Sequence, residues 1–72
     1  GDDERVLPFL LDGLSSSDAA VRETAIRSLR ERTDKEFGYD ALAEPVLRER
    51  AAQRWVEWWE KTRRAVEEEQ AE

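Results

Sequence analysis

The N-terminal part of the chain has apolar residues at helical spacing. Four leucines occupy positions i, i+3, i+4 and i+7, the spacing of one helical face: Leu7, Leu10, Leu11 and Leu14. We therefore predict a helix over about residues 3–14. Pro8 is tolerated only in a first turn, so this helix is expected to begin nearer residue 7 or to bend at the proline. Val6 and Phe9 widen the apolar face, which is typical of a helix covered on two sides.

A second stretch combines an apolar stripe with a charged face. Its apolar residues recur at i, i+4 and i+8: Val21, Ala25 and Leu29. The opposite side carries charged residues that can pair four residues apart: Arg22, Glu23, Arg27, Arg30 and Glu31. The pattern predicts a helix over about residues 19–32, capped by Asp18 or Ser17, with one buried and one solvated face.

The third pattern is the longest. A helix that starts near Pro45, a good first helical residue, can run to about residue 68. Three indole rings share one broad face of it, because at about 100° per residue they lie within about 60° of the first: Trp55, Trp58 and Trp59. Glutamates from Glu67 onward place negative charge at the negative end of the helix dipole. Residues 67–72 are therefore expected to fray.

Residues 33–44 interrupt the helical periodicity and predict an ordered loop. Gly38 stands where the chain is expected to need a positive φ. Apolar side chains give the loop anchors against the helices: Phe37, Tyr39 and Leu42. We therefore expect the loop to pack against the helices.

Together these elements predict an all-α, three-helix fold in a single domain spanning residues 1–72. A hairpin of the first two helices is covered by the long third helix, about residues 45–68. The residues assigned to the core are Leu7, Leu10, Leu11, Leu14, Val21, Ala25, Leu29, Phe37, Trp55 and Trp59.

The composition removes most of the side chains from which active sites and metal centres are built. The 72 residues include no cysteine and no histidine, which supply common catalytic groups and the ligands of zinc, copper and iron. The acidic loop residues Asp34, Glu36 and Asp40 miss the EF-hand ligand positions when Gly38 is placed at the sixth position. We expect no enzyme activity, no cofactor, no metal and no small-molecule substrate.

The net charge of the chain restricts the classes of partner that it can bind. The formal net charge is −6, whereas binding to nucleic acid is driven by basic residues that neutralise phosphates. The same acidity disfavours an anionic membrane surface, and no apolar run approaches the ~18 residues that would span a bilayer. We expect neither a nucleic-acid nor a membrane partner, and the cytoplasm is slightly favoured as the compartment.

The segment from Val6 to Arg32 combines an early proline in the first helix with a capped second helix that contains the pair Val21-Arg22. In this it resembles one HEAT repeat. The tryptophan-rich continuation, including Arg54 to Trp59, resembles a tail that follows such repeats in some bacterial proteins. The resemblance implies a scaffold or protein-binding role and no chemistry. The chain departs from the family in having one repeat, so the third helix would have to act as the cap.

Two groups of residues are candidates for contact with a partner. The first is a basic strip on the second helix, composed of Arg22, Arg27 and Arg30 and extended by Arg32. It could meet an acidic peptide or, less favourably, a phosphate backbone, although Glu23 and Glu31 can neutralise it. The second is the pair Trp58 and Trp59, since tryptophan is enriched at binding hot spots.

The leading functional hypothesis is a non-catalytic protein-interaction or scaffold module, with a protein partner. The alternative is a self-associating module whose third helix carries a short heptad-like seam: Ala51, Trp55, Trp58, Thr62 and Ala65. Binding of nucleic acid or an acidic peptide through the basic strip ranks third. The expected state is a monomer or a weak homodimer.

Overall fold

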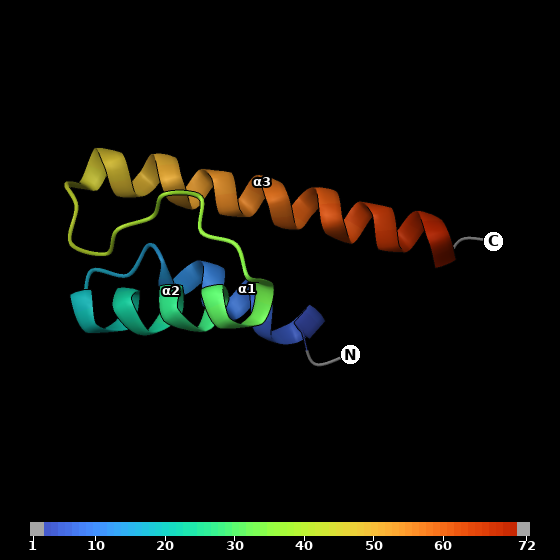
Figure 1. Ribbon diagram of the computed structural model, residues 1–72, viewed down its shortest axis with the longest axis horizontal. Helices are drawn as coiled ribbons and strands as arrows, with labels where there is room; N and C mark the ends of the chain where they lie inside the picture. The colour runs from blue at the N-terminus through green and yellow to red at the C-terminus, as the bar shows by residue number, and fades with distance from the viewer. Residues whose placement is uncertain (1–2, 71–72) are drawn as a thin grey trace.

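The computed structural model describes residues 3–70 and contains three helices (Figure 1). They are α1 (Asp3–Gly13), α2 (Ala19–Thr33) and α3 (Pro45–Gln70). No strand occurs within residues 3–70. The predicted all-α fold with a long third helix is therefore confirmed.

The ends of α2 follow from local chemistry. Asp18 caps the start, since its carboxylate accepts a hydrogen bond of 2.9 Å from the backbone N–H of Ala20. Asp34 ends the helix in the left-handed conformation, with φ 58°, and its N–H donates to the carbonyl of Arg30 at 2.9 Å. Of the two caps considered from the sequence, Asp18 is the one used.

Pro8 lies inside α1, which begins at Asp3. The predicted start near residue 3 is therefore observed, and the alternative of a start nearer residue 7 is excluded. Proline cannot donate to the carbonyl four residues earlier, so α1 lacks that one ladder hydrogen bond. Pro8 is exposed, on the side of the helix away from the core.

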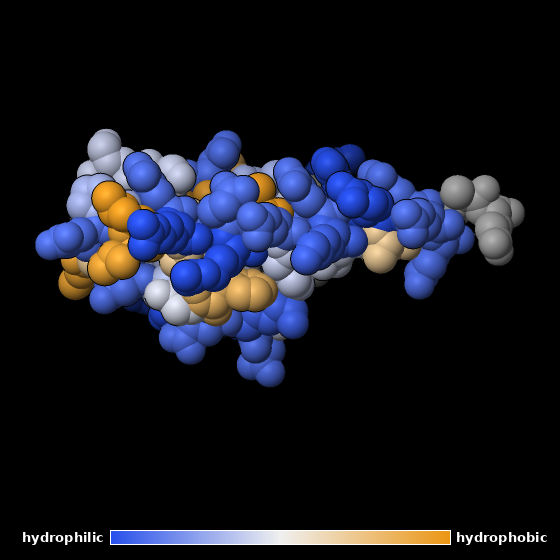
Figure 2. Space-filling view, turned by 90° about the horizontal axis from the view of Figure 1, so that it is seen from above, coloured by the Kyte–Doolittle hydropathy of each residue, from blue (hydrophilic) through white to orange (hydrophobic). Residues whose placement is uncertain are grey.

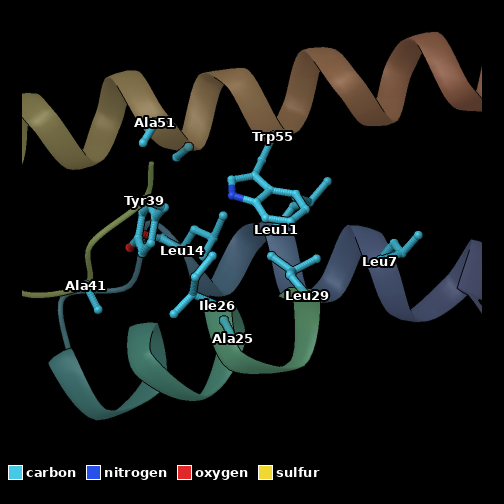
Figure 3. Close-up of a cluster of buried hydrophobic side chains, with 11 residues drawn as sticks. Leu7, Leu11, Leu14, Ala25, Ile26, Leu29, Tyr39, Ala41, Ala51 and Trp55 are labelled. Carbon is cyan, nitrogen blue, oxygen red and sulfur yellow. The ribbon is translucent and has the colours of Figure 1, made fainter. Parts of the chain in front are cut away.

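The core lies where α1, α2, α3 and the intervening loop meet (Figure 3). Trp55 of α3 is 0% exposed and points its indole ring toward Leu11 of α1. Its ring centroid lies 4.8 Å from that of Phe37, edge to face. The remaining buried residues are Leu7, Leu14, Ala25, Ile26, Leu29, Tyr39, Ala41, Ala51 and Ala52.

The helices do not pack equally on one another. α1 packs against both α2 and α3, whereas the backbones of α2 and α3 are not in direct contact. The loop from residue 34 to residue 44 runs between them (Figure 1). The loop is therefore part of the core and replaces a direct α2–α3 contact, in agreement with the predicted ordered loop. Gly38 has the expected positive φ, 71°, and the preceding Phe37 also has one, 57°.

Several residues assigned to the core are less buried than predicted. Val21 is 45% exposed, because it lies on the side of the hairpin away from α3, where no further layer covers it. Three more of them are only partly buried at the edge of the core: Leu10, Phe37 and Trp59. Leu42 is 71% exposed and does not anchor the loop, which is held by Tyr39 and Ala41 instead.

The C-terminal part of α3 extends past both other helices (Figure 1). With 26 residues it is more than twice as long as α1, which has 11, and at about 1.5 Å per residue the excess exceeds about 20 Å. The helix continues to Gln70, two residues beyond the predicted end, while residues 71–72 of the predicted frayed tail lie outside the described residues. All side chains from Arg63 to Glu69 are exposed.

Replacing Trp55 by Ala should lower the free energy of unfolding by about 3–5 kcal/mol, because a large aromatic side chain is lost from the core. That is comparable to the whole stability of a domain of this size. Denaturation followed by far-ultraviolet circular dichroism measures the loss. Trp59→Ala on the same helix is the matched control, and its cost should be smaller because Trp59 is only partly buried. A Trp55→Ala variant that unfolds like the parent would refute the assignment.

Replacing Gly13 by Ala should also destabilise the protein. A Cβ on Gly13 would lie 2.9 Å from the Cβ of Ala25, and overpacking costs about 1–3 kcal/mol, more than the gain in helix propensity of about 1 kcal/mol or less. The melting temperature of Gly13→Ala should fall. Adding Ala25→Gly should reduce the combined cost below the sum of the two single costs. A Gly13→Ala variant that melts above the parent would contradict this close approach of α1 and α2.

Candidate functional site

The arginines of the predicted basic strip hold the loop in place. Arg22 donates from Nε to the carbonyl of Ala41 at 3.0 Å and from Nη1 to the carbonyl of Ser16 at 2.8 Å. Arg30 donates from Nη2 to the carbonyl of Tyr39 at 2.8 Å and forms an ion pair with Glu36 at 3.3 Å. Two of the three predicted binding arginines are therefore engaged within the chain.

A third arginine completes this set from the other side. Arg54 of α3 donates from Nη1 to the carbonyl of Phe37 at 3.3 Å. Arg54, Arg30 and Arg22 thus bind the carbonyls of residues 37, 39 and 41 in turn. The loop is held by guanidinium groups instead of by backbone ladders.

Arg27 is exposed and borders a groove of about 620 Å³ between α2 and the loop. The groove is lined by more acidic than basic side chains: Glu23, Glu31, Glu36 and Asp40 against Arg27 and Arg30. Neither predicted ion pair of Arg27, with Glu23 or with Glu31, is formed in the described part of the chain. The electrostatic balance of this groove argues against the docking of an acidic peptide or a phosphate backbone.

Trp58 and Trp59 belong to an aromatic cluster at the edge of the core. The centroid of Trp58 lies 5.8 Å from that of Trp55, edge to face, and 6.4 Å from that of Trp59. The ammonium group of Lys35 lies 6.0 Å from the centroid of Trp58, at the outer limit of a cation–π contact. These contacts explain the two rings as packing residues, each with one edge in solvent.

The least covered apolar surface of the described residues lies along α1 and α2. Phe9 is 76% exposed and borders a groove of about 510 Å³ between the two helices. Seven of its eight lining residues are uncharged, namely Phe9, Leu10, Gly13, Ala20, Val21, Thr24 and Ala25, and the eighth is Asp12. We call this surface the α1–α2 groove. The sequence indicated it only through the width of the apolar face of the first helix.

A smaller set of exposed apolar residues lies where the loop leads into α3. Leu42, Val46 and Leu47 are all exposed, and the helix face that α3 presents is otherwise mainly hydrophilic (Figure 2). Leu47 is 55% exposed, although at about 100° per residue it lies on the same broad face of α3 as Trp55. Leu42 borders the groove between α2 and the loop, in which charged side chains form most of the lining.

Tyr39 is the buried ionisable group of the loop. Its hydroxyl donates to the carbonyl of Leu14 at 2.6 Å and so ties the loop to the end of α1. Burial raises the pKa of Tyr39 above its ordinary value of 10.0, and Asp40 raises it further, while the charges of Arg22 and Arg48 lower it. The group is therefore neutral at physiological pH and acts as a donor.

The described residues include no group of three or more acidic side chains placed to hold a metal ion. Within the same residues, no helix combines the length and the apolar character needed to cross a bilayer. The chain matches no family model, and no curated protein and no solved structure matches it.

The fold should lose stability at alkaline pH through Tyr39. Because its pKa is raised in the folded state, the contribution is complete below about pH 10, the unfolded value, and is lost as the pH rises through the folded pKa. Tyr39→Phe should cost about 0.5–1.5 kcal/mol at neutral pH through the lost hydrogen bond. The difference from the parent should shrink at alkaline pH.

Tyr39 is the only tyrosine of the chain, so the absorbance of its phenolate reports its pKa directly. Denaturant unfolding at neutral and at alkaline pH gives the free energy of unfolding of the parent and of Tyr39→Phe. The difference between the two proteins separates the effect of Tyr39 from that of all other titrating groups. A stability difference that is equal at both pH values, or a folded-state pKa of Tyr39 at or below 10.0, would contradict the role given to Tyr39.

Proposed function

We propose that this chain is a non-catalytic protein-interaction module of the HEAT-repeat type, which docks a helix of a partner protein on the α1–α2 groove. The observation that carries the proposal is Phe9, a large apolar side chain that is 76% exposed on the rim of an apolar groove. The helical hairpin of α1 and α2 and the HEAT-like pattern of residues 6–32 support the same interpretation. In repeat proteins, each hairpin buries its outer face against a neighbouring helical unit.

The groove has the chemistry of a helix-binding surface. Its floor is formed by small residues, Gly13, Ala20 and Ala25, while Phe9 and Val21 contribute larger apolar side chains. Small residues let a partner backbone approach closely, and large exposed side chains gain most from burial, at about 25 cal/mol per Å² of apolar surface. An amphipathic helix with apolar residues at i, i+3, i+4 and i+7 presents a complementary ridge.

The charge at the groove restricts the partner further. Asp12 is the one charged residue of the lining, and its carboxylate is complementary to a lysine or arginine beside the apolar anchors of the partner. A second copy docked through the same groove about a two-fold axis would bring two Asp12 carboxylates into one interface. We therefore assign the groove to a different protein, with a basic residue next to its apolar stripe.

The test uses a synthetic amphipathic helical peptide with leucine at i, i+3, i+4 and i+7 and lysine elsewhere. A second peptide carries glutamate in place of lysine on the same leucine face. The lysine peptide should bind the parent protein more tightly than the glutamate peptide, and Phe9→Ser should weaken its binding at least about tenfold. Fluorescence anisotropy of the labelled peptides measures the affinities. Because Phe9 is largely exposed, its replacement should leave the melting temperature nearly unchanged.

Leu42→Ser is the matched control, since Leu42 is 71% exposed and lies outside the α1–α2 groove. It should bind the lysine peptide like the parent. Asp12→Asn should narrow the preference for lysine over glutamate without removing binding. Equal binding by the parent and Phe9→Ser, or equal losses in Phe9→Ser and Leu42→Ser, would overturn the proposal.

A further inference from the structure

The part of α3 that extends past the hairpin has a divided charge pattern. Its first turn carries three positive side chains, Lys61, Arg63 and Arg64, and its last described turns carry three negative ones, Glu67, Glu68 and Glu69. Residues 61–69 are therefore locally neutral, although the chain as a whole has a net charge of −6. We call this part the α3 extension.

Small and apolar residues follow one side of the α3 extension. At about 100° per residue, Thr62, Ala65 and Val66 continue the helix face on which Trp55 lies. Nothing in the described part of the chain covers them fully: Thr62 is partly buried, while Ala65 and Val66 are exposed. The N-terminal half of the heptad-like seam, Ala51 and Trp55, is buried inside the protein, so only this C-terminal half is accessible.

We propose that two copies of this chain associate through their α3 extensions, antiparallel, about a two-fold axis near Ala65. With the axis there, residue 61 of one copy lies opposite residue 69 of the other, and residue 63 lies opposite residue 67. Each copy thus places Lys61 against a glutamate and Arg63 against a glutamate. Every such pair occurs twice because the interface is isologous.

The charge pattern selects this orientation over the parallel one. A parallel pair would align the glutamates of both copies, and like charges that face each other are destabilising. An antiparallel pair also opposes the two helix dipoles and brings the basic turn of one copy toward the negative C-terminal end of the other. The small side chains of Thr62 and Ala65 allow the two backbones to approach near the axis.

The side chains needed for these pairs are available. Arg63 and Glu67 form an ion pair within the helix at 3.9 Å, and their side chains are 58% and 68% exposed. At this distance and exposure the pair contributes little, so either partner can exchange it for a shorter contact across the interface. The copies must approach each other from solvent, and the exposed side chains of residues 63–69 leave that approach open.

The size of the interface sets its strength. Nine helical residues span about 14 Å, so the contact falls below the ~1,200 Å² typical of stable complexes. The dimer is therefore weak, forms at high protein concentration and weakens as salt screens the ion pairs over a Debye length of about 8 Å at physiological ionic strength.

Sedimentation at several protein concentrations tests the association, at low and at high salt. One variant reverses the basic turn (Lys61→Glu, Arg63→Glu, Arg64→Glu), and another reverses the acidic turn (Glu67→Lys, Glu68→Lys, Glu69→Lys). Each variant alone should lose self-association by at least about tenfold. An equimolar mixture of the two variants should recover association, as a mixed dimer. Each variant's extension has one sign throughout, so the mixture pairs an all-acidic helix with an all-basic one.

 That mixed dimer should form and should be tighter and more salt-dependent than the parent dimer, while neither variant pairs with itself.

Cross-linking tests the orientation, and the absence of cysteine from the chain makes single introduced thiols unambiguous. A mixture of Lys61→Cys and Glu69→Cys proteins should form the mixed disulfide between positions 61 and 69 under mild oxidation. The Glu69→Cys protein alone should form little disulfide-linked dimer. The groove variant Phe9→Ser should self-associate like the parent, so this test is independent of the proposed function.

Three outcomes would overturn the inference. One is a strict monomer at high concentration and low salt. Another is a dimer that survives reversal of either charged turn. The third is a preference for linking position 69 to position 69, which would indicate parallel helices.

Discussion

The burial of Trp55 is the contact on which the rest of the structure depends. The backbone of α3 comes close to that of α1 but not to that of α2, and Trp55 is the largest side chain that is fully buried in the described residues. Ala51 and Ala52, one turn earlier, are small enough to let α3 approach the hairpin. The indole Nε1 has no hydrogen-bond partner in the described part of the chain, a cost of about 1–3 kcal/mol. The apolar contacts of the ring must outweigh that cost, which makes the site one of packing and not of polar recognition.

The loop between α2 and α3 extends this packing to α2, whose backbone does not approach that of α3 closely. Tyr39 contributes a buried ring and a hydrogen bond to the end of α1, and guanidinium groups from α2 and α3 bind its carbonyls from either side. Two of the arginines that form a basic strip in the sequence are therefore part of the fold. A guanidinium that already donates to backbone carbonyls has fewer donors left for a phosphate or a carboxylate. The exposed apolar residues are therefore better candidates for contact with a partner than these two arginines.

The two surfaces proposed for binding lie on different elements. The α1–α2 groove is apolar with a single carboxylate in its lining, whereas the α3 extension is highly charged with a narrow apolar side. We propose the first for an amphipathic helix of another protein and the second for a second copy of this chain. Because the two surfaces share no residue, a module of this kind could hold a partner on its hairpin while it pairs through its third helix.

The sequence by itself determined the elements of this protein. Hydrophobic spacing and capping residues placed all three helices to within about two residues of their observed ends, since both signals act locally along the chain. The spacing also identified Trp55 as core, and Gly38 as a position with positive φ. It could not separate Val21 from Ala25, which lie on the same stripe, because only the position of α3 decides which side of the hairpin is covered. For the same reason the sequence could not show that Leu11 is buried and Phe9 exposed, since both are apolar residues of one helix. The role of Arg22 and Arg30 was likewise decided by tertiary structure, because their acceptors are carbonyls of a loop whose path no local pattern specifies.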